Sequence, residues 1–224
     1  MSGIGGLNLQ GISVSPRFIF GVNGKIRNSL HRVDEHKLLY VAGHNACVYS
    51  TDEKNQYFLE GSENVEKITA VAVSPSNRFV AICQRAEKAK CIIYDIHTQK
   101  LKQTLPDQDI DTDDYEAKEF LSAAFPVKNE QTQMVTLTGA PDWVLLLWDI
   151  DNIKVLSKIN VGFSGFASQI NPKPGEEVDE PDHNLMCSYN PLEVTGDPSR
   201  VVVTGDNTFY IFKIVADVLD SELT

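Results

Sequence analysis

The feature that most constrains the fold is a pattern of short β-prone segments and tight turns that recurs along the chain. Residues 68–105 show it most clearly. Apolar residues recur up to Ser74 and Pro75, where proline removes a backbone donor and marks the end of a strand. Three more β-prone segments follow, separated by turns. Strands joined by short turns pair as antiparallel hairpins, so this region is predicted to form one four-stranded sheet.

The pattern occurs four times in all. Residues 120–159 form a second clear copy, residues 186–212 form a copy that ends before its fourth segment, and residues 26–59 form a degenerate first copy. A single such unit is too small to bury its own apolar face, so the copies must stack. We predict an all-β chain of about four β-propeller blades. The positions expected to be packed are Ala70, Ala72, Val80, Ile82, Phe125, Leu145 and Leu147, with Trp148 filling the space between sheets.

Two acidic segments interrupt the repeats. Residues 107–119 hold seven acidic residues and one lysine, and residues 171–183 hold five acidic residues and three prolines. Such composition does not bury a core, so both are predicted to be solvated loops that protrude from the sheets. Loops on a rigid frame often carry binding. The candidate partner-binding residues are therefore Asp111, Asp113, Asp114, Glu176, Glu177 and Asp179.

The dipeptides at the ends of the third segments give the chain a family resemblance. Tyr94-Asp95 and Trp148-Asp149 match the Trp-Asp position of the WD40-repeat family, and Ser74-Pro75 match the Ser-Pro that ends its inner strand. The resemblance makes these six residues the structural WD-motif positions. More narrowly, the chain resembles the amino-terminal region of a cilia- and flagella-associated WD-repeat protein, through Phe18-Ile-Phe-Gly21, Ala42-Gly-His-Asn45, Ala117-Lys-Glu-Phe120 and Gly139-Ala-Pro-Asp-Trp143.

The narrower resemblance implies a location and a role. It implies a non-enzymatic scaffold of the ciliary or flagellar axoneme, which tethers or regulates complexes associated with the inner dynein arms on doublet microtubules. The implied partners are other axonemal proteins. A generic cytosolic WD-repeat adaptor in a soluble assembly is the alternative. A third possibility is an acidic β-propeller hydrolase, which would need acidic residues that converge in the central channel.

Composition and motifs exclude several other classes. A net charge of −11 without a cluster of lysine and arginine argues against nucleic-acid binding. The sequence contains no apolar run long enough to span a membrane, no nucleotide-binding or hydrolase motif and no metal-ligand spacing, so we expect no cofactor and no catalysis. The four cysteines are expected to be buried thiols, although Cys83 and Cys91 fall on neighbouring strands and could approach each other.

The predicted organisation is a flexible segment over residues 1–17, propeller blades over residues 18–215, and a tail or the start of a continuation over residues 216–224. Phe18 to Phe20 resemble an outer, sealing strand that joins a final blade. Since closure removes exposed sheet edges, we expect a larger propeller, seven-bladed or double, whose remaining blades come from another chain or from further sequence. The alternative is a closed four-bladed ring in which Phe18 to Phe20 complete the last copy.

Overall fold

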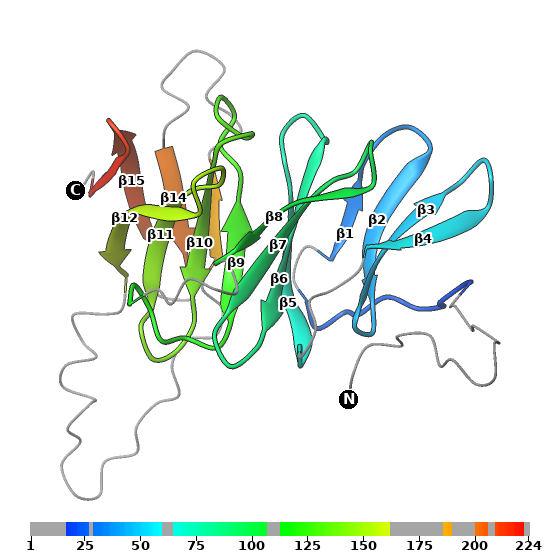
Figure 1. Ribbon diagram of the computed structural model, residues 1–224, viewed down its shortest axis with the longest axis horizontal. Helices are drawn as coiled ribbons and strands as arrows, with labels where there is room; N and C mark the ends of the chain where they lie inside the picture. The colour runs from blue at the N-terminus through cyan, green and yellow to red at the C-terminus, as the bar shows by residue number, and fades with distance from the viewer. Residues whose placement is uncertain are drawn as a thin grey trace, which may run out of the picture.

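The fold is described from a computed structural model, which places residues 17–26, 29–59, 65–106, 113–161, 186–189, 200–205 and 209–221. In these ranges all regular structure is β-strand, arranged as four antiparallel sheets of four strands each (Figure 1). The predicted all-β class and the four propeller-type blades are confirmed. We number the sheets blade 1 to blade 4 in chain order.

The strands of each blade follow one another in sequence order from one edge to the other. Blade 1 contains β1 (Leu30–Arg32), β2 (Lys37–Ala42), β3 (Asn45–Ser50) and β4 (Asn55–Leu59); blade 2 contains β5 (Lys67–Val73), β6 (Phe79–Arg85), β7 (Lys90–Asp95) and β8 (Lys100–Leu105); blade 3 contains β9 (Phe120–Ala124), β10 (Gln133–Thr138), β11 (Val144–Asp149) and β12 (Lys154–Asn160); blade 4 contains β13 (Met186–Tyr189), β14 (Arg200–Thr204), β15 (Phe209–Val215) and β16 (Val218–Ser221).

The turns between the third and fourth strands are built alike in the first three blades. Each contains a non-glycine residue with positive φ, namely Lys54 at 51°, Gln99 at 57° and Ile153 at 54°. Positive φ matches the twist of a tight hairpin, and it is uncommon for residues other than glycine. The recurrence of this conformation at one position shows that the copies repeat in backbone geometry as well as in sequence.

Three apolar clusters hold the blades together, one between each pair of neighbours. One cluster joins blades 1 and 2, a second joins blades 2 and 3, and a third joins blades 3 and 4. Because side chains alternate across a strand, each interior blade contributes to two clusters. On β11, Leu145 and Leu147 face blade 4, whereas Leu146 and Trp148 face blade 2. All seven predicted packed positions are buried, and Trp148 is 1% exposed between blades 2 and 3.

The blades form an open row. In Figure 1, blade 1 lies at one end of the molecule and blade 4 at the other. No apolar cluster of the described residues joins these two end blades. The alternative of a closed four-bladed ring is therefore wrong for this structure.

The end of the chain also differs from the prediction. The last copy was expected to stop before its fourth strand, with a tail over residues 216–224, but β16 pairs with β15 along Val218 to Ser221. Leu219 is buried in the cluster with blade 3, and this burial stabilises the strand. Blade 4 is thus complete from its own sequence.

The predicted sealing strand lies elsewhere. Phe18 to Phe20 have no strand assignment. Instead, the backbone N–H of Ile19 donates to Gln56 Oε1 at 2.8 Å, and Gln56 Nε2 donates to the carbonyl of Ile19 at 3.0 Å. The Phe18 ring meets Tyr49 edge-on, with 6.2 Å between ring centroids. This segment therefore lies against blade 1 and does not complete blade 4.

Candidate interaction surfaces

The aspartates of the WD motifs stabilise the turns that follow the third strands. Asp149 accepts hydrogen bonds from the backbone N–H groups of Asp151 and Asn152, both at 3.1 Å, and from the Asn152 side chain at 2.7 Å. These bonds, with the Asn152 side chain contributing most, lower the pKa of Asp149 below its usual value. The carboxylate is thus committed to its own turn.

Asp95 has the equivalent role in blade 2. It accepts the backbone N–H of Thr98 at 3.0 Å and the Nε of Arg78 at 2.8 Å. Burial by itself would raise the pKa of Asp95, but the hydrogen bonds from Thr98 and Arg78 and the charge of Arg78 outweigh it, so the pKa lies below its usual value.

The aromatic residues of the WD motifs are core residues. Tyr94 is buried between blades 1 and 2. The indole N–H of Trp148 donates to the hydroxyl of Thr136 at 2.8 Å, within the same buried region. The motif therefore provides packing and an internal hydrogen bond.

Ser74 and Pro75 lie in the turn between β5 and β6. The Ser74 hydroxyl accepts the backbone N–H of Phe79 at 3.0 Å, while Pro75 is exposed. The next residue, Ser76, is bound by blade 3, because Glu130 accepts both its N–H, at 3.0 Å, and its hydroxyl. This turn therefore ties neighbouring blades together at one end of the sheets.

At the opposite end of the sheets, residues 113–119 form a segment that we call the connector, because it leads from blade 2 to blade 3. The Tyr115 hydroxyl donates to the carbonyl of Ala89 at 2.7 Å, and Asp142 Oδ2 accepts the N–H groups of Glu116 and Ala117 at 2.6 and 2.7 Å. Burial raises the pKa of Tyr115 far above its usual value. The connector is thus fixed to both blades.

This packing corrects the prediction of a protruding acidic loop for the part of it that the structure describes. Tyr115 is 3% exposed and Ala117 is fully buried, because these two apolar side chains alternate with the charged ones and enter the core between blades 2 and 3. Counting acidic residues overlooked this alternation. The signal that could have revealed it was the spacing of Tyr115, Ala117 and Phe120 among the charged residues.

The candidate partner-binding acids are separated in the structure. Asp113 is exposed, and Asp114 pairs with Lys158 of β12 at 3.0 Å. Of the other acids in the connector, Glu119 contacts Lys67 at 3.5 Å and Arg85 at 3.4 Å. The remaining candidates, Asp111, Glu176, Glu177 and Asp179, lie outside the described residues.

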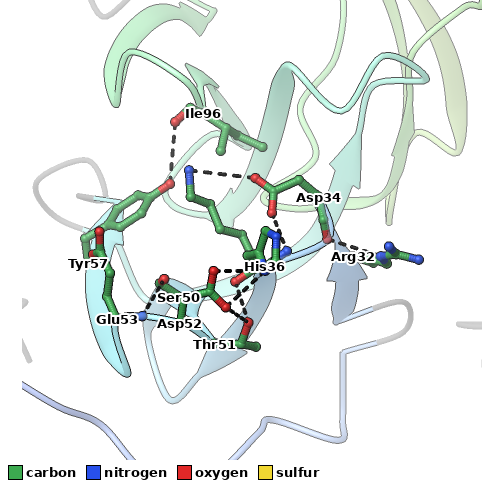
Figure 2. Close-up of polar contacts among 10 residues, drawn as sticks. Arg32, Asp34, His36, Ser50, Thr51, Asp52, Glu53, Tyr57 and Ile96 are labelled. Atoms are coloured by element: carbon green, nitrogen blue, oxygen red, sulfur yellow. Dashed lines mark hydrogen bonds and ion pairs between the residues drawn. The ribbon is translucent and has the colours of Figure 1, made fainter.

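The turns of blade 1 form a polar cluster (Figure 2). His36 Nδ1 lies 3.0 Å from Asp52, with both side chains more than half exposed, and Lys37 lies 3.7 Å from Asp34. Close by, the Tyr57 hydroxyl donates to the carbonyl of Ile96 at 3.5 Å, which links blade 1 to blade 2. Burial raises the pKa of Tyr57 to about 12. The cluster orders two turns at the end of the first blade.

Blade 4 carries an apolar face that none of the described blades covers. On β14 and β15, Val201, Val203 and Phe212 point toward blade 3, so the alternate residues point away. Of these, Val202 and Ile211 are paired across the two strands. The exposed large residues of this blade are Phe209 at 67%, Val215 at 51% and Val218 at 53%.

In the part of the chain that the structure describes, no group of three or more His, Cys, Asp or Glu side chains is placed to hold a metal ion. The same described residues contain no helix that is long and apolar enough to cross a membrane.

No protein-family model matches the chain. Curated proteins do: it is 31% identical to cilia- and flagella-associated protein 57 C of Tetrahymena thermophila over 199 residues, and 26% identical to mouse cilia- and flagella-associated protein 57 over 170 residues. Mouse cilia- and flagella-associated protein 44 is 26% identical over 129 residues. These alignments cover 88%, 75% and 58% of this chain.

The chain spans 14%, 13% and 6% of the lengths of these three relatives. The predicted relationship to the cilia- and flagella-associated proteins is confirmed, and the predicted ciliary assignment agrees with the names of all the relatives found. With its four propeller-type blades and its WD-motif turns, this chain is a homologue of a segment of the cilia- and flagella-associated proteins.

Proposed function

We propose that this chain is a non-enzymatic interaction platform of the ciliary axoneme, where it tethers or regulates complexes associated with the inner dynein arms on doublet microtubules. The observation that carries the proposal is the similarity over 88% of the chain to a cilia- and flagella-associated protein. The alternative is a generic cytosolic adaptor in a soluble assembly, which the same blades would serve equally well.

The use of the polar side chains supports a scaffold over a catalyst. Catalytic carboxylates need a cleft and a free position next to a substrate. Here three carboxylates accept hydrogen bonds from backbone N–H groups of the turns and of the connector, namely those of Asp95, Asp142 and Asp149. Their hydrogen bonds keep the loops at the blade ends in fixed positions, which suits a surface that binds large partners.

The face of blade 4 that no described blade covers supports a specific kind of partner, namely another blade-type sheet. At each of the three junctions in this chain, the apolar face of one blade packs on the apolar face of the next. The outward residues of blade 4, which include Val202 and Ile211, have the same strand positions as residues that fill those junctions. A further blade would bury them by the same packing.

Localisation of the protein tests the axonemal role. We expect the tagged protein, expressed in a ciliated cell, to remain with the detergent-resistant axoneme after the membrane is removed. Proximity labelling should then recover inner-dynein-arm components. Tagged protein that stays in the cell body would defeat the axonemal role and favour the cytosolic adaptor. Axonemal protein without labelled dynein components would defeat only the tethering role.

Substitution on the face of blade 4 tests the blade partner. The isolated chain should self-associate through this apolar face, and Ile211→Asp should reduce that association because a buried charge is costly. Lys100→Asp, on the exposed outer strand of blade 2, is the matched control. Light scattering after size-exclusion chromatography measures the mass. A wild-type chain that is monomeric at all concentrations would contradict the proposal.

A further inference from the structure

Two cysteines occupy opposed positions near the end of the hairpin formed by β6 and β7. Cys83 on β6 and Cys91 on β7 are register partners, and both are fully buried. Opposed residues of an antiparallel pair have Cα atoms about 4.5–5.5 Å apart. This separation falls within the range of about 4.4–6.8 Å that a disulfide spans. The strand register therefore places the two thiols within bonding reach.

The other two cysteines lie in other blades and are not register partners of this pair. Cys47 lies on β3 of blade 1, and Cys187 lies on β13 of blade 4; both are buried free thiols. Their strand partners are Tyr40 and Phe58 for Cys47, and Val203 for Cys187. Among the described residues, only the pair in blade 2 is matched across neighbouring strands.

The connector shields this pair. Cys83 and Cys91 belong to the cluster between blades 2 and 3, together with Ala89, Tyr115 and Ala117. The neighbouring Cys91 thiol and the burial of the site raise the pKa of Cys83 well above its usual value, so little thiolate forms while the connector is seated. Lifting the connector would expose the thiols to water and let them ionise.

We propose that Cys83 and Cys91 are a latent dithiol, which a small soluble disulfide such as oxidised glutathione converts to a cross-strand disulfide when the connector lifts from blade 2. One cysteine thiolate attacks a sulfur of oxidised glutathione and releases one reduced glutathione. The second cysteine thiolate then displaces the other glutathione from the mixed disulfide. The two protons lost by the cysteines end on the two released glutathione thiols, so the protein is oxidised by two electrons.

Oxidation would act on the junction between the blades. A sulfur–sulfur bond is much shorter than the contact between two thiols, so it draws the two side chains together beneath Tyr115 and changes the surface on which the connector packs. The connector also carries the hydrogen bonds to Asp142 of blade 3. The modification therefore sits where the contact between blades 2 and 3 is made.

Peptide mapping after oxidation tests the proposal. The full 224-residue chain is reduced, freed of reductant, and treated with excess oxidised glutathione at neutral pH without denaturant. The remaining thiols are then alkylated and the chain is digested. We expect a linked peptide that joins Cys83 to Cys91, while Cys47 and Cys187 stay reduced. Mixed pairings, or linkage that forms only in denaturant, would overturn the proposal.

Two connector variants test whether the connector controls the reaction. Asp142→Ala removes the acceptor of two backbone N–H groups and should speed the linkage at least about tenfold, given the usual strength of hydrogen bonds to charged groups. Asp113→Ala changes an exposed side chain of the same connector and should leave the rate unchanged.

Tyr115→Phe provides a second variant in case Asp142→Ala fails to fold. It keeps the ring and removes only the hydroxyl that donates to Ala89, so a smaller acceleration is expected. Equal linkage rates in the wild type and in every folded variant would overturn control by the connector. Oxidation of Cys47 by glutathione at the same rate as Cys83 would also overturn control by the connector, because it would indicate that the whole chain unfolds.

Discussion

At the scale of single residues, the polar atoms at the blade junctions have specific partners. Trp148 is 1% exposed, and its one polar atom reaches the hydroxyl of Thr136, which is fully buried. A buried N–H without an acceptor would cost more than an ordinary hydrogen bond contributes. The Thr136 hydroxyl therefore satisfies the indole of Trp148, which lies diagonally across the strand pair because the register partner of Trp148 is Met134.

Thr136→Val should destabilise the chain by about 1–3 kcal/mol, because valine keeps the shape of threonine but leaves the indole N–H unpaired. Thr136→Ser, which keeps the hydroxyl, is the control and should cost less. Urea unfolding followed by tryptophan fluorescence measures both. A valine variant as stable as the wild type would show that the hydrogen bond contributes nothing.

The WD-motif aspartates predict an acid dependence of stability. The pKa values of Asp95 and Asp149 lie below the ordinary value of 3.8 in the folded chain, so the unfolded state binds protons more readily. Their stabilisation is fully present above that value and is lost as the pH falls through the lower folded values. We expect the free energy of unfolding to fall in this acidic range. The combined variant Asp95→Asn and Asp149→Asn should fall less steeply; an unchanged slope would contradict the assignment.

At the scale of elements, the two central strands of each interior blade contribute to two cores. Leu146 packs between blades 2 and 3, and Leu147 packs between blades 3 and 4, although they are adjacent on β11. Both are fully buried. A substitution on one face of the strand should therefore destabilise mainly the junction on that side.

Leu146→Ala and Leu147→Ala should each cost about 2–5 kcal/mol, the usual range for a buried leucine. Hydrogen exchange should distinguish them. Leu147→Ala should increase exchange mostly in blade 4, and Leu146→Ala mostly in blade 2. The same pattern of exchange in both variants would contradict the assignment of alternate faces.

The strands that the sequence predicted well are those bounded by recognisable turns. Proline, glycine and asparagine mark the ends of the strands around β5, β6, β10 and β11, and the alternation within them locates their buried faces. By contrast, β16 follows a turn formed by Ala216 and Asp217 at φ values of 48° and 64°. Alanine is rarely found in this conformation, so composition gave no signal for the turn or for the strand after it.

The connector was mispredicted for a different reason. Most of its residues are charged, and composition therefore predicts an exposed loop. Its position is instead set by two buried side chains, Tyr115 and Ala117, which are two residues apart in the sequence. Their contacts with Ala89 and Asp142 come from hairpins of two different blades. Such contacts depend on how the blades stack, which single-sequence patterns do not specify.

At the scale of the whole molecule, an apolar cluster joins each pair of neighbouring blades, and among the described residues none joins the two end blades. Stability should then resemble that of a linear repeat protein, in which each unit depends on its neighbours. Blades 2 and 3 are covered on both faces, whereas blade 4 is covered by another described blade on one face alone.

This arrangement predicts a gradient of protection along the chain. Backbone amides of β6, β7, β10 and β11 should exchange with solvent more slowly than those of β14 and β15. Hydrogen exchange followed by mass spectrometry of the wild-type chain measures this difference directly. Uniform protection of all four blades would contradict this prediction. It would show that the end blades are covered and that the chain unfolds as one cooperative unit.

The sharing of each interior strand between two cores limits how such a chain can change length during evolution. Insertion of one residue in the middle of β6 or β10 would reverse the orientation of every side chain beyond it, and so disturb the junctions on both sides at once. Insertion of one residue in an exposed turn would leave the side-chain orientations within the strands unchanged. Length variation among related chains should therefore be concentrated between strands, whereas strand interiors should change by substitution alone.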